Sequence, residues 1–468
     1  MSTSKRRLEE LSASLASRAG GKRPRPAKKA SLDPSAKYLA NPLAAPVVAR
    51  WRARFGKSAK VFVGPSAGWR SVAKLAARRI EGKLVLGLFA PKSHDVVESA
   101  RLCGAHAPEL NVAIAAVENL CGAGVSVYAA GEKADTGSLS YVAVATAAKG
   151  KVIVYLVFNA SLSSTAAAKA CHALSKALSK APWLHSLHAH YNVVTQHDNA
   201  IFGRGGPETW KLLLPAGATA QQGFACDLTG LAQLSLKGCA AKLFFAPPCF
   251  RQANLDQFAA IVRKIETFVP KKARVVELYG GVGTIGANLL RKARSVECSD
   301  ENPWNAACVA RTIDALAPDQ RKRLTYETKP AAAVAREGGL GECDVVIVDP
   351  PRKGLCPDVV AALLRPALQP RLLVYVSCGF DALRRDLHDL SGKWTQKHVE
   401  AHVLFPGADH IETLVVLEEA GFAAAQAKRA GDAATDAKKR TDAAQSEETQ
   451  PKAKKKKRRP RGPAKPAE

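Results

Sequence analysis

Cysteine pairs, long apolar runs and a secretory leader are all missing from this 468-residue sequence. Its 11 cysteines all lie between Cys103 and Cys378, without a CxxC pair or a histidine cluster at metal-ligand spacing. The spacing therefore predicts neither a disulfide framework nor a metal site, and it favours a reducing compartment. No apolar run approaches the ~20 residues that span a bilayer, and the N-terminus lacks the apolar core of a signal peptide. We expect no membrane partner.

Positive charge, in contrast, is in large excess. The formal net charge is +28, of which residues 1–60 carry 12 and residues 421–468 carry 8. Basic tails of this kind can follow a phosphate backbone without reading its sequence, so we favour polyanion binding over a solubilising role. The run AKKKKRRPR at 453–461 favours the nucleus over the cytoplasm. An organellar presequence stays open, although Glu9 and Glu10 argue against one.

The composition predicts four regions. Residues 1–40 and 421–468 are rich in Ala, Lys and Arg and are expected to be disordered basic tails. Residues 41–250 mix short strands and helices, with a hairpin over 141–158, and predict an α+β central domain. Residues 251–420 alternate strands with helices, which is typical of a doubly wound parallel α/β sheet.

The C-terminal half is expected to contain six strands. We expect them at the start of 274–293 and over 294–298, 344–349, 371–378, 399–405 and 411–418. Only five residues separate the last two, so one of these should run antiparallel. In the central domain, a basic stretch from Trp69 to Arg79 has two open interpretations: phosphate contact, or a solvated helix face.

Cys378 and Asp349 each follow a predicted interior strand. The apolar run LLVYV leads into Ser377 and Cys378, and DVVIV leads into Asp349 and two prolines. Ligands of α/β sheets gather beyond the carboxyl ends of strands, and the prolines stiffen the exit that carries Asp349. Cys378 is therefore a candidate nucleophile, although a free cysteine is often only a small apolar core residue.

A glycine-rich turn, ELYGGVGTIG at 277–286, predicts a nucleotide site. Gly281 and Gly283 let the backbone turn tightly before a helix begins. About twenty residues on, Glu297 is placed to accept hydrogen bonds from the two hydroxyls of a ribose. The turn is not GxGxxG, and a dinucleotide has no obvious second site. A mononucleoside cofactor such as S-adenosylmethionine fits better.

These motifs carry a resemblance. FRQAN (250–254), ELYGGVGTIG, DPPRKG, VSC and FPGADHIE (405–412) occur in the order and rough spacing of the S-adenosylmethionine-dependent RNA uracil-5-methyltransferases of tRNA and rRNA. The likeness is specific over about 245–418 and weaker over 60–120. It implies a Rossmann-like class I methyltransferase domain, preceded by an RNA-binding central domain. The expected partner is an RNA with an unstacked uridine, bound by a monomer.

The resemblance also implies roles. Cys378 would be the nucleophile and Glu412 the general base, while Asp349 would hold the uracil and face the cofactor. Phe250 would lie near the target base. Further cofactor contacts would come from Gln252, Tyr279, Thr284 and Glu297. Because uracil C5 is a poor nucleophile, a thiolate must first add to C6, and a base must later remove the C5 proton.

The sequence departs from that family at two points. Asn-Pro usually follows the nucleophile, and here it is Gly379-Phe380; Ala408 stands where a threonine is usual. With no cysteine before Cys103, we expect no iron–sulfur cluster, and residues 1–60 lack the strand pattern of an RNA-binding barrel. A catalytically silent RNA-binding protein is the alternative. Arg352 disfavours amino-group and cytosine-5 methyltransferases, which place other residues after Asp-Pro-Pro.

Overall fold

The computed structural model describes residues 37–90, 93–96, 98–120, 125–129, 131–193, 201–202, 206–214, 232–365 and 370–422. The predicted basic tails lie almost wholly outside these residues, so their disorder stays a prediction. Residues up to Glu418 form one compact unit, and only the first residues of a second unit, Glu419–Glu468, are described. No helix within the described ranges is long and apolar enough to cross a membrane.

The C-terminal half forms the predicted doubly wound sheet. Its order is β1-β15-β16-β14-β13-β10-β11-β12. The strands are β1 (Val61–Val63), β10 (Arg274–Leu278), β11 (Ser295–Asp300), β12 (Leu324–Thr328), β13 (Val345–Val348), β14 (Leu372–Ser377), β15 (Trp394–Val403) and β16 (Glu412–Glu419). Strands β10 to β14 run parallel, and β16 pairs antiparallel with β14, which confirms the predicted antiparallel strand.

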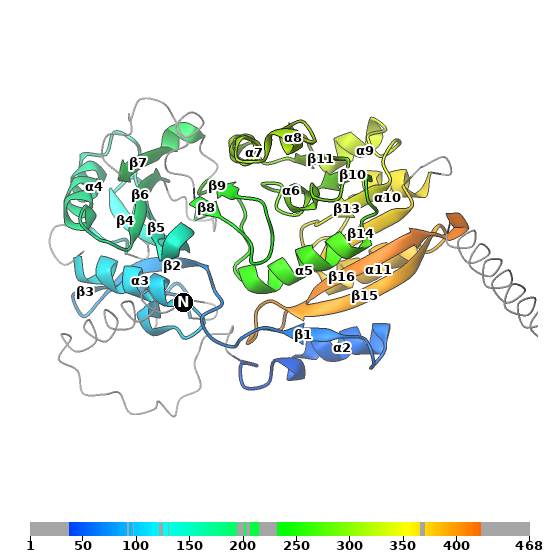
Figure 1. Cartoon of the computed structure of the whole chain (residues 1–468). Helices are drawn as coiled ribbons and strands as arrows, with labels where there is room; N and C mark the ends of the chain where they lie inside the picture. Colours follow the sequence, from blue (N-terminus) through cyan, green and yellow to red (C-terminus); the bar gives the residue numbers. More distant parts are fainter. Residues whose placement is uncertain are drawn as a thin grey trace, which may run out of the picture. The chain divides into compact units, whose positions relative to one another are not determined.

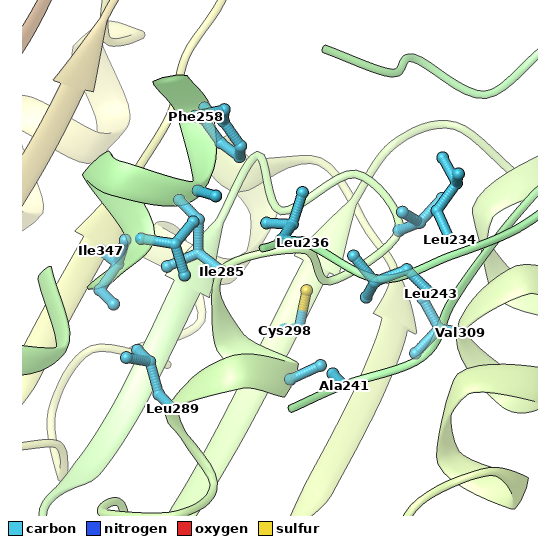
Figure 2. Close-up of a cluster of buried hydrophobic side chains, with 14 of the residues drawn as sticks. Leu234, Leu236, Ala241, Leu243, Phe258, Ile285, Leu289, Cys298, Val309 and Ile347 are labelled. Carbon is cyan, nitrogen blue, oxygen red and sulfur yellow. The ribbon is translucent and has the colours of Figure 1, made fainter. Parts of the chain in front are cut away.

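Helices cover both faces of this sheet because its buried strands carry apolar side chains that alternate in direction. Val275 points into a core with α5 (Leu255–Phe268), α6 (Gly286–Leu289) and α7 (Trp304–Asp314), part of which is drawn in Figure 2. Val276 points into the opposite core. That core contains α9 (Ala331–Arg336), α10 (Pro357–Leu364) and α11 (Phe380–Leu390), and α8 (Pro318–Arg321) follows α7.

A second, mostly antiparallel sheet has the order β3-β2-β4-β5-β6-β7. Its strands are β2 (Val72–Ile80), β3 (Lys83–Gly87), β4 (Ser138–Thr146), β5 (Val152–Asn159), β6 (Leu184–Tyr191) and β7 (Trp210–Leu214). Helices α3 (Pro108–Leu120) and α4 (Thr165–Leu178) lie against it (Figure 1) and share one apolar core with it. A short pair, β8 (Ala232–Leu234) and β9 (Leu243–Phe245), follows in the chain.

Three features differ from the prediction or sharpen it. Strand β1 pairs with β15, and Trp51 of α2 (Pro46–Phe55) is buried against that same edge, so the start of the predicted central domain at 41 belongs with the C-terminal sheet. The basic stretch that ends at Arg79 is mostly strand β2 and not a helix face. The helix expected after the glycine-rich turn is only one turn long, α6. The other predicted boundaries stay predictions.

Candidate active site

The register of the strands brings Cys378 and Glu412 to the same end of the sheet, where β14 ends and β16 begins. Ser377 and Thr413 are the last paired residues of the antiparallel pair β14–β16. Cys378 is the next residue on one strand and Glu412 the next on the other, so they face each other across the end of the ladder. Cys378 is partly exposed and Glu412 is buried.

Asp349 and Arg352 complete the group. Strand β13 lies beside β14 and runs parallel to it, so Asp349, directly after β13, reaches the same edge of the sheet. The loop that follows approaches the nucleophile closely. A Cβ added at Gly379 would fall well inside contact distance of the Arg352 carbonyl oxygen, so glycine allows this approach.

The thiol and the carboxyls hold their protons strongly. Burial, together with the nearby Glu412 and Asp349 carboxyls, raises the pKa of Cys378 to about 11, while Arg352 opposes them. Burial raises the pKa of Asp349 to about 7. Burial also raises the pKa of Glu412 well above its ordinary value, with Asp349 adding to the effect and Arg352 opposing it. One buried Glu412 oxygen has no hydrogen-bond partner among the described residues. Once ionised, Glu412 would be a stronger base than an ordinary glutamate.

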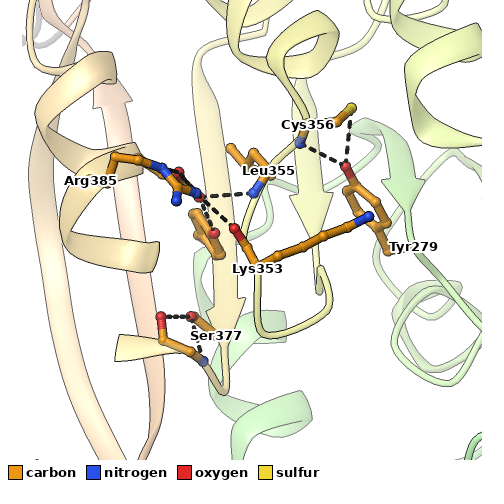
Figure 3. A network of polar contacts seen from close by, with 9 residues as sticks. Tyr279, Lys353, Leu355, Cys356, Ser377 and Arg385 are labelled. Carbon is orange, nitrogen blue, oxygen red and sulfur yellow. Dashed lines mark hydrogen bonds and ion pairs between the residues drawn. The ribbon is translucent and has the colours of Figure 1, made fainter. Parts of the chain in front are cut away.

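A buried carboxylate fixes the loop after Asp349 (Figure 3). Asp386 of α11 accepts hydrogen bonds from the Leu355 N–H at 2.9 Å and from the Tyr375 hydroxyl at 2.6 Å. Arg385 donates to the Lys353 carbonyl oxygen at 2.7 Å. Loop and strand are therefore joined through side chains from the helix that begins two residues after Cys378.

The glycine-rich turn forms a cradle at the end of β10. Gly281 has φ +56°, and its N–H donates to an Asp300 oxygen at 2.9 Å. A Cβ added at Gly281 would meet no atom within 4 Å, so the turn faces open space. Tyr279 also has a positive φ, and its hydroxyl donates to the Cys356 sulfur at 3.4 Å. Strand β10 lies between β11 and β13, where the strand order reverses, the usual ligand site of such sheets.

The assignment of a ribose contact to Glu297 is wrong in position. Glu297 is exposed within β11, which continues to Asp300 at the carboxyl edge. Asp300 also accepts hydrogen bonds from the Asn302 N–H and the Asn305 amide, which fix its carboxylate beside the cradle. The strand exit could have been located in the sequence from Asn302-Pro303, a pair that favours turns.

The cradle fits a nucleoside cofactor. The fixed Asp300 carboxylate beside the open side of the turn suits the hydroxyls of a ribose, and the half-buried Tyr279 and Thr284 lie on the same turn. Gly283 donates its N–H to the Gly280 carbonyl oxygen and closes the turn.

The FRQAN segment joins the two sheets. Arg251 donates to the Thr146 and Ser71 carbonyl oxygens at 2.7 and 2.9 Å. Asn254 donates to the Leu404 carbonyl oxygen at 2.9 Å, on the segment that leads to Glu412. Ser71 also donates to the Gln252 carbonyl oxygen at 3.3 Å. Phe250, the expected neighbour of the target base, is 71% exposed.

The chain is similar to known RNA methyltransferases. The family model described as conserved hypothetical protein 95 matches residues 248–403. An uncharacterized RNA methyltransferase of Protochlamydia amoebophila is 31% identical over 362 residues, which cover 76% of this chain and 87% of that protein. The tRNA (uracil(54)-C(5))-methyltransferase of Pyrococcus abyssi is 30% identical over 171 residues, or 36% of this chain and 39% of that protein.

A solved structure shows the fold class of this chain. The crystal structure of the Pyrococcus abyssi tRNA (uracil-54, C5)-methyltransferase in complex with S-adenosyl-L-homocysteine matches with a TM-score of 0.59 at 21% identity, covering 79% of this chain and 81% of that one. The larger sheet is thus the Rossmann-like sheet of class I S-adenosylmethionine-dependent methyltransferases. The chain belongs to the RNA methyltransferase family of these relatives, which confirms the predicted family and enzyme class.

Proposed function

We propose that this protein transfers a methyl group from S-adenosylmethionine to C5 of a uridine in tRNA or rRNA, through a covalent Cys378 adduct at C6. The observation that carries the proposal is the convergence of Cys378, Glu412 and Asp349 on one sheet edge, next to the nucleoside cradle. Relatives named tRNA (uracil(54)-C(5))-methyltransferase support uridine as the target base.

Each residue has a defined task in this reaction. The Cys378 thiolate forms a bond to C6, and the electrons of the C5–C6 double bond move onto the C4 carbonyl oxygen as an enolate. S-adenosylmethionine, when bound, would supply the electrophilic methyl group: C5 would take the methyl as the sulfonium S–CH3 bond breaks, and S-adenosylhomocysteine would leave. The Glu412 carboxylate removes the C5 proton, the C5–C6 double bond re-forms, and the bond from C6 to Cys378 breaks. Asp349 would orient the uracil ring, and the positive charge of Arg352 would favour the thiolate.

Two measurements test the proposal. RNA from cells with and without the protein should differ in 5-methyluridine at a defined position when mapped by mass spectrometry. RNA carrying 5-fluorouridine at that position should form a stable adduct with the protein, because fluorine at C5 cannot leave as a proton. If both kinds of cell contain the same amount of 5-methyluridine and no adduct forms, the proposed methylation is refuted. The protein would then be the catalytically silent RNA-binding protein of the alternative hypothesis.

A further inference from the structure

A cavity of about 740 Å³ lies apart from the thiol and the carboxyls. Its walls come from the six-stranded sheet, the segment around Leu102, and the FRQAN segment with Phe250. Neither Cys378, Asp349 nor Glu412 lines it. A space of this size can hold a nucleotide.

Apolar side chains are unusually exposed in this cavity. Leu88, Leu102 and Phe250 are 49%, 78% and 71% exposed, and all three line it. The partly buried aromatic ring of Phe202 is also part of the wall. Exposed apolar groups gathered at one place mark a binding surface, and aromatic rings offer faces on which a base can stack.

Positive charge accompanies the apolar wall. The Lys74 ammonium group lies 4.6 Å from the centre of the Phe202 ring and has no carboxylate partner within the described part of the chain. Although Lys74 is exposed to the cavity, the surrounding protein removes enough hydration to lower its pKa. Arg70 and Arg251 line the same space, where Glu98 is the single acidic residue among the described lining. An anion would compensate these cations.

Aromatic contacts connect the cavity to the catalytic segment. Trp69, in the cavity wall, meets the Phe405 ring edge-to-face at 5.5 Å. Phe405 in turn lies 6.3 Å from the His410 ring, two residues before Glu412. The cavity wall therefore contacts the segment that leads to Glu412, where the target base is expected to bind.

We propose that the cavity takes up a second unstacked nucleotide of the substrate RNA, adjacent to the target uridine, with its base among Leu102, Phe202 and Phe250 and its phosphate near Lys74. This inference rests on the proposed function, because it assigns a further subsite for the same RNA. Recognition of that nucleotide would help to select one uridine among many.

Thiol footprinting tests the subsite on the full chain. Cys103 lines the cavity and is partly exposed; Cys378 is partly exposed in the active site; Cys239 is partly exposed outside both. The probe is iodoacetamide, with RNA from cells that lack the protein, and peptide mass spectrometry reports alkylation at each thiol. We expect RNA to slow alkylation of Cys103 and Cys378 at least about fivefold and to leave Cys239 unchanged.

Variants at the wall provide a second readout. Lys74→Met and Leu102→Glu should raise the KM for RNA about tenfold, with a smaller effect on kcat, and should abolish the protection of Cys103 while keeping that of Cys378. Matched controls are Lys83→Met, at an exposed position of the same sheet, and Leu162→Glu, which lies in a loop and outside the cavity. Both controls should keep the wild-type KM. Thermal unfolding checks that all four variants fold.

The outcomes separate the two hypotheses. Protection of Cys378 with an unprotected Cys103, or a wild-type KM in folded Lys74→Met and Leu102→Glu proteins, overturns the subsite and leaves the proposed methylation standing. If neither thiol is protected and no adduct forms with 5-fluorouridine RNA, the proposed function fails and the subsite fails with it.

Discussion

The two sheets of this chain carry their functional groups in different places. The eight-stranded sheet is buried on both faces, and its candidate reacting groups gather at one end, where Asp349 and Cys378 follow parallel strands and Glu412 begins an antiparallel one. The six-stranded sheet is covered by α3 and α4 on one face, and part of its other face lines a cavity. The groups at this end of the sheet are buried or partly buried and hold their protons tightly, whereas the cavity in the six-stranded sheet offers exposed apolar and cationic side chains.

This difference suggests that the larger sheet carries out the chemistry and the smaller sheet binds RNA. Chemistry needs thiol and carboxyl groups fixed within reach of one base, which strand ends supply. Recognition of RNA needs area, aromatic faces and positive charge, which a sheet face supplies. Substitutions at the edge should therefore change bond making, and substitutions on the face should change affinity.

The largest effect is expected for Cys378→Ala. Removal of the nucleophile should lower methyl transfer by roughly 10⁴-fold or more, because the covalent route is lost. RNA affinity and cofactor affinity should remain close to those of the wild type, measured by filter binding and calorimetry. Cys239→Ala is the matched control and should keep full activity. A Cys378→Ala protein that still forms the 5-fluorouridine adduct would refute the assignment.

Glu412→Gln should have the next largest effect. Cysteine addition and methyl transfer would proceed, but without a base the C5 proton stays in place, so release should slow by roughly 10²- to 10⁴-fold. A methylated covalent RNA–protein species should then accumulate on denaturing gels and be identified by mass spectrometry. If Glu412→Gln turns over at the wild-type rate, another residue must be the general base, and His410 is the next candidate.

Prediction from the sequence succeeded where strand ends decide the geometry. Cys378 and Asp349 were placed correctly because both follow apolar runs, and parallel strands share one carboxyl edge. Glu412 depended on the resemblance alone, since its place follows from a long-range antiparallel pairing. Glu297 was misplaced because the strand end was set too early. The cavity was not predicted, because its lining, from Trp69 to Phe250, is assembled from segments far apart in the sequence.

Gly379→Ala should displace the loop beside Cys378 without removing any reacting group. The new Cβ would collide with the Arg352 carbonyl oxygen, so the loop that carries Arg352 must shift away from Cys378. We expect kcat to fall about tenfold or more, as misplacement of a site by about 1 Å commonly does. Gly392→Ala is the matched control, because its Cβ would meet no atom within 4 Å. Equal rates for both variants would show that the loop adapts freely.

Glu277→Gln should raise the free energy of unfolding at alkaline pH. Glu277 is buried and accepts the Gly286 N–H at 3.0 Å, and burial raises its pKa from 4.5 to about 8. The folded state therefore prefers the protonated acid, so the wild type loses stability as pH rises from about 4.5 to 8. The amide introduced by Glu277→Gln cannot ionise, so this variant should be more stable than the wild type at pH 8.5, by up to about 5 kcal/mol, and similar at pH 4.5. Thermal unfolding of the cofactor-free proteins measures this, with the exposed Glu342→Gln as control.

The smallest effect on turnover is expected from the basic tails. We propose that residues 1–36 and 423–468 add RNA affinity that does not depend on sequence, and that AKKKKRRPR serves as a nuclear import signal. Each phosphate contact releases counterion, so log affinity should fall against log salt by roughly 0.7 per contact on single strands. Deleting both tails should flatten that slope and weaken binding to every RNA alike, while kcat at saturating RNA changes by less than about twofold, since the candidate reacting groups Cys378, Asp349 and Glu412 belong to the described core. An unchanged salt slope would instead assign the phosphate contacts to the described core, with Lys74 and its neighbours in the cavity as the first positions to substitute.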